Sequence, residues 1–307
     1  MIHSIVGSYT LMKYPPEKKY DPLYRKLRSA IYKGDTLVCM SPGKSVPLDE
    51  TIPIGDYTVE DFVEGVMINV FYDEDWKIAT KSNIGANCRF DSPRTFAELF
   101  EDCKQAVGLD YDMLNKNLSY SFVMQHPDHR IVTPITKPSL VCVAKFHGEE
   151  EFLADLFPPA RHLFSSWEEA KEAAQRGLGK GLVFKYKGLR SKIRNRMHHS
   201  IEQLKQNVPF PERYIKLRNK PQLKEYLFYF PEEKGKADAL ETKIQEKTQL
   251  LYTTYRDCFM FKKEKAKDHP LKTVLYDLHT IYLQELYPHS LSKKRVEEYV
   301  CKYIWKE

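Results

Sequence analysis

The spacing of apolar residues divides the chain into two parts. In the first part, short apolar or alternating runs lie between turn residues, which predicts strands over residues 35–40, 66–72, 76–80, 119–124, 130–135, 140–146 and 181–186. The acidic turn at residues 73–75 joins two of these runs, so we expect residues 63–72 and 76–82 to form an antiparallel hairpin.

Helix signals are sparse in the first part and dominate the second. A short helix is expected over residues 23–30 and a longer one over residues 95–107, with Ser92 as its N-cap and Pro93 in its first position. A capping box at residues 165–168 predicts a further helix, which ends near Gly177.

Beyond about residue 197 the apolar residues recur at helical spacing. Two helix faces are marked by Leu271, Val274, Leu275, Leu278 and Ile281, and by Val296, Tyr299, Val300, Tyr303 and Ile304. The predicted fold class is therefore α+β for about the first 195 residues, followed by an all-α region. We expect two domains, over residues 1–197 and 198–307.

The composition is that of an ordinary globular protein. Hydrophobic residues make up 42% of the 307 positions and charged residues 29%, which excludes a wholly disordered chain. The longest apolar run is far shorter than the ~18 residues that a membrane span needs. The N-terminus lacks the basic and apolar regions of a secretory signal. Six cysteines are scattered without a Cys-x-x-Cys pair, so an intracellular location is expected, either the cytoplasm or a host cytoplasm for a viral protein.

Positive charge is concentrated in the second part of the chain. Residues 1–180 hold 21 Lys and Arg against 26 Asp and Glu, whereas residues 181–307 hold 27 against 16. Six cations and no acid lie between Gly181 and Arg196. This asymmetry is typical of a protein with a polyanionic partner, although a solvated cationic surface has the same signature.

Isolated catalytic motifs are weak. Residues 42–45 (Pro-Gly-Lys-Ser) end like a phosphate-binding loop but lack its first glycine. His126 and His129 could lie together on a turn, but a third ligand is missing nearby, so no protein-bound metal is predicted.

A series of short polar motifs nevertheless follows the predicted strands in a fixed order. It comprises Arg28-Ser29, residues 42–45, Val-Glu-Gly at 63–65, Thr80-Lys81 in the return strand, Ser-Phe-Val-Met at 121–124, Pro-Asp-His-Arg-Ile-Val at 127–132, Lys-Gly-Leu-Val at 180–183, and Lys-Ile-Arg at 192–194. In this order and spacing, the series resembles the phage-type RNA ligases that repair tRNA, within the covalent nucleotidyltransferase superfamily. The resemblance covers about residues 25–195.

The resemblance implies a fold and an activity. The fold would be the ATP-grasp-like set of antiparallel sheets found in the adenylation domain of RNA and DNA ligases, followed by a basic helical domain for RNA. The activity would be RNA strand joining or nucleotidyl transfer with ATP and Mg²⁺ or Mn²⁺, on broken tRNA or other RNA ends. The implied cofactor-binding residues are Glu64, Gly65, Lys81, Phe122, Arg130, Lys180, Lys192 and Arg194.

The sequence also departs from that family. Its members use a lysine that attacks the α-phosphate of ATP and holds AMP as a phosphoramidate. Counting back from Glu64, the corresponding position holds Phe62, which cannot form this bond. Lys180 occupies the place of a glutamate, and Val123 replaces the acid of a Phe-Glu strand.

Lys44 is the predicted substitute nucleophile. It corresponds in order to a lysine of the family's Lys-Phe-Phe-Asn segment and follows a Pro-Gly turn, which restricts the backbone. Lys81 and Lys180 are further candidates. Two functions remain open, namely an RNA-ligase-like nucleotidyltransferase and a catalytically degenerate protein that binds RNA or a nucleotide on the ligase fold. The oligomeric state is also left open.

Overall fold

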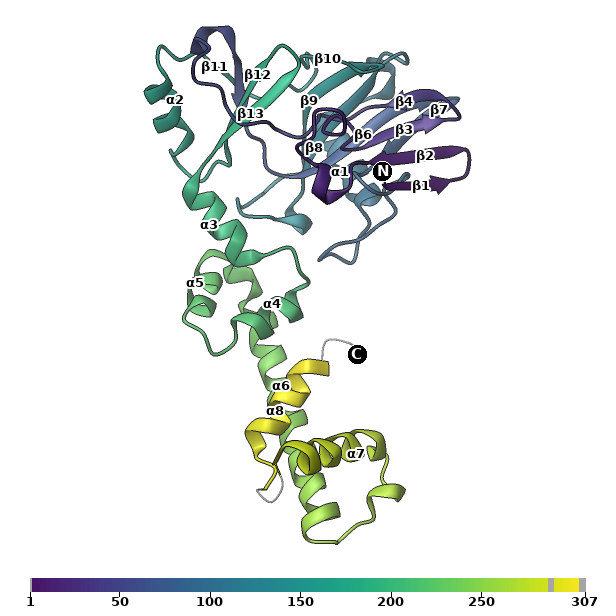
Figure 1. Cartoon of the computed structure of the whole chain (residues 1–307), viewed down its shortest axis with the longest axis vertical. Coiled ribbons are helices and arrows are strands. Elements are labelled where there is room, and N and C mark those ends of the chain that lie inside the picture. Colours follow the sequence, from purple (N-terminus) through teal and green to yellow (C-terminus); the bar gives the residue numbers. More distant parts are fainter. Residues whose placement is uncertain (1, 287–289, 304–307) are drawn as a thin grey trace. The chain divides into compact units, whose positions relative to one another are not determined.

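The computed structural model describes residues 2–286 and 290–303 of the chain. These residues form two compact units, Met1–Gln206 and Asn207–Glu307 (Figure 1). The sequence-based boundary between residues 197 and 198 falls inside α3 (Arg196–Lys205), which belongs to the first unit. Within the described residues, no helix is both long and apolar enough to cross a membrane.

The first unit contains three sheets whose neighbouring strands all pair antiparallel. In spatial order, the first sheet consists of β1 (Ile2–Val6), β2 (Tyr9–Lys13), β3 (Ala30–Lys33) and β4 (Thr36–Cys39). The second consists of β10 (Glu150–Phe152), β9 (Ser139–His147), β8 (Ser119–Gln125), β6 (Val66–Asp73) and β7 (Asp75–Ala79). The third consists of β11 (Arg161–His162), β5 (Thr58–Asp61), β12 (Gly181–Tyr186) and β13 (Leu189–Arg194).

Two helices cover these sheets. Helix α1 (Phe96–Val107) buries Leu99, Phe100 and Cys103 against the five-stranded sheet. The ring centroids of Phe100 and Phe122 lie 6.4 Å apart in an edge-to-face arrangement. Helix α2 (Trp167–Ala174) packs its small residues on the third sheet. The sheets next to the site are thus each held by their own apolar core.

Most of the predicted strands are confirmed. Strands β4, β8, β9 and β12 lie where the apolar runs predict them, and β6 pairs with β7 as the expected hairpin. The α+β class with antiparallel sheets, followed by helices, is likewise confirmed.

Three helix predictions need correction. Residues 23–30 form turns that lead into β3, and Leu23 is 81% exposed, so the segment has no apolar helix face to bury. The N-cap of α1 is Thr95 rather than Ser92, because Thr95 and Glu98 form a reciprocal capping box. In α2, the N-cap is Ser166, which accepts from the backbone N–H of Glu169, so the capping pair lies one residue later than predicted.

The strand predicted over residues 130–135 is wrong. Residues 127–129 form a short 3-10 turn, and the following backbone is bonded to a side chain instead of a neighbouring strand. The N–H groups of Val132 and Thr133 donate to the Glu64 carboxylate at 2.9 and 3.0 Å. A buried acceptor therefore replaces the ladder that the β-branched residues suggested.

All regular elements in the described residues of the second unit are helices. It comprises α4 (Phe210–Leu217), α5 (Gln222–Tyr229), α6 (Lys234–Tyr255), α7 (Lys272–Ile281) and α8 (Lys293–Tyr303), with π-helical turns at Arg256–Met260 and Tyr282–Leu286. Leu275, Leu278, Val296 and Val300 are buried, as the helical spacing predicts. Ile304, from the second predicted face, lies outside the described residues.

Ion pairs tie the helices of this unit together. Arg218, at the end of α4, donates to both oxygens of Glu241 on α6 at 2.6 and 2.8 Å, and it also pairs with Glu297 on α8. Such bidentate pairs are stronger and more directional than single surface contacts.

Candidate functional site

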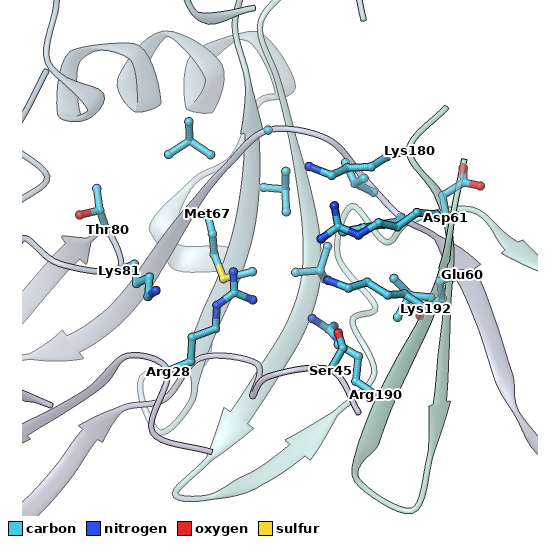
Figure 2. A pocket seen from close by; sticks show the side chains of 18 of the residues that line it. Arg28, Ser45, Glu60, Asp61, Met67, Thr80, Lys81, Lys180, Arg190 and Lys192 are labelled. Carbon is cyan, nitrogen blue, oxygen red and sulfur yellow. The ribbon is translucent and has the colours of Figure 1, made fainter. Parts of the chain in front are cut away.

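A cavity of about 360 Å³ lies between the second and third sheets of the first unit (Figure 2). Apolar side chains from both sheets form part of its wall, among them Met67, Val123, Val143 and Val183. Within the described residues, the wall also carries six cationic and two acidic side chains, namely Arg28, Lys81, Lys180, Arg190, Lys192, Arg194, Glu60 and Asp61. Such a mixture of apolar surface and convergent polar groups is typical of small-molecule sites.

Strand alternation explains why three of these cations face the cavity. Arg190, Lys192 and Arg194 are two residues apart on β13, so they lie on the same face of the strand. Ile193, on the opposite face, packs against the apolar core beneath α2. Figure 2 shows Lys180 and Lys192 projecting into the cavity from one side, opposite Arg28 and Lys81.

Phe62 lies in the cavity wall, where its ring faces three cations. The Nζ atoms of Lys192 and Lys180 are 4.7 and 5.1 Å from the ring centroid, and the guanidinium carbon of Arg194 is 6.0 Å away. Cations at these distances are attracted to the face of an aromatic ring. The ring of Phe62 thus serves as a platform for positive charge.

Lys192 has the most perturbed amine of the cavity. Burial, together with the nearby charges of Arg194, Lys44, Arg28 and Lys180, lowers the pKa of Lys192 to about 7. In the described part of the chain, no carboxylate pairs with this amine to offset these effects. A substantial fraction of Lys192 is therefore neutral near neutral pH.

Lys81 is perturbed in the same direction by a similar environment. Burial and the charges of Arg28, Lys13 and Lys44 lower its pKa below the ordinary lysine value. Its Nζ atom lies 5.6 Å from the Tyr14 ring centroid. Positive charges lie on both sides of the cavity, so a bound anion would relieve their mutual repulsion.

The carboxylates at the cavity are already engaged. Glu60 pairs with Lys185 at 2.8 Å and with Arg161 at 3.4 Å. Asp61 pairs with His162 at 2.8 Å. Both acids are thus already paired with basic side chains. No cluster of three metal-ligating side chains occurs among the described residues.

Glu202 on α3 reaches the rim of the cavity. Its carboxylate accepts from Lys180 at 3.0 Å and from Arg194 at 3.4 Å. Burial alone would raise the pKa of Glu202, but the charges of these cations and the hydrogen bonds from Lys180 and His199 lower it. Glu202 therefore fixes two of the three cations that surround Phe62.

Glu64 faces away from the cavity into a buried network. It is 6% exposed and binds the Nε2 atom of His198 on α3 as well as the backbone of residues 132 and 133. Burial raises the pKa of Glu64, but the hydrogen bonds from His198 and from the Val132 and Thr133 N–H groups outweigh it and lower the pKa. The side chain anchors α3 and the 127–133 segment to the start of β6.

The close approach of strand β8 leaves no room for a side chain at Gly65. Its φ is +148°, and a Cβ atom would lie 2.3 Å from the carbonyl oxygen of Met124 on β8. Although Gly65 also lines the cavity, this backbone contact by itself explains why a glycine stands here.

The structure brings together five of the residues that the motifs assign to the cofactor. They are Gly65, Lys81, Lys180, Lys192 and Arg194. Glu64, Phe122 and Arg130 are placed elsewhere. Phe122 is fully buried in the core beneath α1, and the Arg130 side chain donates to the carbonyl oxygen of Val132.

Lys44 lies in a groove next to the cavity. The groove has a volume of about 460 Å³ and shares Ser45, Lys192 and Arg194 with the cavity. The Lys44 Nζ atom is 5.6 Å from the ring centroid of Tyr20, which is 63% exposed.

Sequence reasoning missed several members of the cavity, among them Arg190 and Glu60. Arg190 precedes Lys192 by two residues, so strand alternation alone could have identified it. Glu60 carries no such signal, because its place in the wall depends on how β5 pairs with β11 and β12.

Comparison with known proteins links the chain to ligases. No family model matches it. An RNA ligase from Rhodothermus phage RM378 is 30% identical over 91 residues, which cover 26% of this chain and 21% of the ligase. The chain thus matches about a fifth of the length of that relative, and the similarity agrees with the resemblance drawn from the motifs.

Three solved structures are similar at low sequence identity. An archaeal ATP-dependent RNA ligase is 11% identical, with 99% of this chain and 92% of that chain covered and a TM-score of 0.45. A putative ATP-dependent DNA ligase from Aquifex aeolicus is 14% identical, with 92% and 77% covered and a TM-score of 0.44. The Naegleria gruberi RNA ligase with PPi is 12% identical, with 50% and 53% covered and a TM-score of 0.37. With every TM-score below 0.5, these likenesses carry no argument about the activity of this chain.

Proposed function

We propose that this chain is an RNA-ligase-like nucleotidyltransferase that uses ATP and acts on RNA ends, by strand joining or nucleotidyl transfer. The observation that carries the proposal is the cavity itself. It combines an apolar wall with cations that converge from both sides, and its position beside residues 62–65 matches the order of the motifs. The segment shared with a phage RNA ligase supports the same activity.

The two kinds of wall suit the two ends of a nucleotide. The apolar side chains of Met67, Val123 and Val143 offer a surface for a base, and the cations offer partners for phosphate oxygens. Since Glu60 and Asp61 are already paired, the divalent ion would arrive with ATP as its Mg²⁺ or Mn²⁺ complex, held by the phosphates.

RNA is the proposed partner, with broken tRNA ends as a candidate substrate. The excess of Lys and Arg over residues 181–307 would contact phosphates without regard to base sequence. The basic edge formed by Arg194 and Arg196 lies directly beside the cavity, in a neighbouring groove of about 390 Å³. RNA bound along this edge would place an end near the nucleotide.

The second candidate is a protein that binds the nucleotide or an RNA end without covalent chemistry. One observation favours it: Phe62 stands where the family has its nucleophile. Incubation with α-labelled ATP and Mg²⁺ or Mn²⁺, followed by a denaturing gel, separates the two functions. A covalent label together with joining of a nicked 5′-phosphate RNA supports the enzyme, whereas ATP binding without label or joining supports the binder.

A further inference from the structure

We propose that Lys192, rather than Lys44, is the amine that accepts the nucleotidyl group. This inference rests on the proposed function and concerns which residue performs its covalent step. It begins from position: Lys192 projects into the cavity from β13 (Figure 2). Its Nζ atom lies 4.7 Å from the centroid of the Phe62 ring, whereas Lys44 lines only the adjoining groove.

The protonation state of Lys192 suits a nucleophile. An ordinary lysine is almost wholly protonated at neutral pH and has no free electron pair on its nitrogen. The pKa of Lys192 is lowered to about 7 by burial and by the surrounding cations, so about half of this amine is neutral near that pH. The same cations that depress its pKa are the groups that would hold the phosphates.

The other amines of the cavity are less suited. Lys180 donates to Glu202 at 3.0 Å, so its nitrogen is already engaged by a carboxylate. Lys81 is also desolvated, but it lies after β7 and on the opposite side of the cavity from Lys180 and Lys192 (Figure 2). Lys192 is held on a strand that pairs with β12, opposite Val183, which limits the entropy lost when its side chain is positioned.

The covalent step balances without any further reactant than the metal complex of ATP. The neutral Nζ atom of Lys192 attacks the α-phosphorus, and an N–P bond forms as the bond from that phosphorus to the bridging oxygen breaks. Pyrophosphate leaves with the electron pair of the broken bond. The nitrogen releases one proton to solvent, and AMP remains on Lys192 as a phosphoramidate.

Phe62 has a defined part in this arrangement. It stands at the position that the resemblance gives to the family's lysine, and its ring face lies 4.7 Å from the Nζ atom of Lys192, which it helps to position. Lys180 and Arg194 approach the same ring, where Glu202 fixes both of them. The proposal therefore connects two features: a phenylalanine stands where the family has its lysine, and three cations gather around that phenylalanine ring.

The test is covalent labelling of the full-length chain with α-labelled ATP and Mg²⁺ or Mn²⁺. The variants are Lys192→Arg, which keeps the positive charge but cannot form the phosphoramidate, and Lys116→Arg as a matched control on an exposed turn. Thermal unfolding and ATP binding are measured on each. The labelled wild-type protein is digested, and the modified peptide is located by mass spectrometry. The label should be lost in acid and kept in alkali, because the P–N bond of a phosphoramidate is hydrolysed in acid and is stable in alkali.

The inference is supported if the wild type and Lys116→Arg are labelled, Lys192→Arg is not, and the labelled peptide contains residue 192. A full label on Lys192→Arg, or a labelled peptide containing residue 44, 81 or 180, overturns the inference and leaves the proposed function standing. If the wild type binds ATP but is never labelled, the inference fails and the binding protein is favoured. If it neither binds ATP nor joins RNA, the proposed function fails as well. Because the mapping uses the wild type, it decides the matter even if Lys192→Arg binds ATP poorly.

Discussion

The Nζ atom of Lys192 lies 4.7 Å from the centre of the Phe62 ring, at the point where the second and third sheets face each other across the cavity. Phe62 follows β5 directly, and Lys192 lies within β13 of the same sheet. An aromatic ring cannot replace a nucleophilic lysine chemically, but it can hold one that approaches from another strand. This contact links the departure from the ligase motif to the cations that the rest of the motif series supplies.

Replacing Phe62 by leucine tests the platform. Leucine preserves much of the apolar volume but removes the ring face, so the attraction for Lys192, Lys180 and Arg194 is lost, at about 0.5–1 kcal/mol for each exposed cation–π contact. We expect ATP to bind about 2- to 10-fold more weakly, as measured by isothermal titration calorimetry, with the thermal midpoint nearly unchanged. An affinity equal to that of the wild type would show that the ring does not organise the cations.

The labelling rate should depend on pH through the Lys192 amine. Raising the pH removes its proton, so the rate should increase through about pH 7 and then level off, because the pKa of Lys192 is lowered to about 7. An ordinary lysine would give a rate that still increases above pH 9. The measurement is the initial rate of covalent labelling at ATP concentrations well below KM, between about pH 5.5 and 9.5, because kcat/KM reports the pKa values of the free protein. A rate that keeps climbing above pH 9 would point to an unperturbed amine.

Much of the first unit could be predicted from sequence, because its strands carry strong local signals. The runs that became β8 and β9 each contain a continuous apolar stretch, at residues 122–124 and 140–144, which agrees with their place in the middle of a sheet. Residues 130–135 hold four β-branched residues but form no strand, because the Glu64 carboxylate accepts from the N–H groups of Val132 and Thr133. A contact between residues 68 positions apart leaves no local trace in the sequence.

The candidate site was predictable to a similar extent. The motif order located Lys81, Lys180, Lys192 and Arg194, which all line the cavity. It could not reveal that Lys44 lies in the adjoining groove, because this depends on the path of the loop between β4 and β5. Nor could it identify the environment of Lys192, whose neighbouring charges come from several elements far apart in the chain.

Gly65→Ala should destabilise the first unit. Alanine would strain a backbone at φ +148°, and its Cβ atom would lie 2.3 Å from the Met124 carbonyl oxygen, so β6 and β8 must separate. We expect a loss of more than about 1 kcal/mol in the free energy of unfolding, measured by urea denaturation. Gly55→Ala is the matched control, because a Cβ atom there meets no other atom within 4 Å. Equal stabilities of the two variants would contradict this account of Gly65.

Glu64→Gln should loosen the contact between β6 and α3. The amide accepts hydrogen bonds less strongly than the carboxylate and loses the charge that His198 faces, which should cost about 1–3 kcal/mol at neutral pH. Because the folded-state pKa of Glu64 is lowered, its contribution is present above the unfolded-state value and disappears as the pH falls through the folded-state value. The difference in the free energy of unfolding between wild type and variant should therefore shrink in acid.

Glu17→Gln, on an exposed turn, serves as the control and should change the free energy of unfolding by less than about 0.5 kcal/mol. A difference that persists at the lowest pH at which both proteins stay folded would rule out a role for the Glu64 charge.

RNA binding should be strongly sensitive to salt. If the Lys and Arg residues beyond residue 180 bind RNA through its phosphates, each neutralised phosphate releases counterions, and the logarithm of the affinity falls linearly with the logarithm of the salt concentration. We expect a slope of about −0.7 for each phosphate contacted on a single strand, measured by fluorescence anisotropy with a labelled oligoribonucleotide between about 50 and 200 mM salt.

Arg196→Ala, at the groove beside the cavity, should make that slope shallower by the value of about one phosphate contact, and it should weaken binding to RNAs of unrelated sequence to the same extent. Lys116→Ala, which removes a cation from an exposed turn of the first unit, is the control and should leave the slope unchanged. An affinity that stays constant over this range would exclude phosphate contacts as the basis of binding, and the basic helices would then have a different partner.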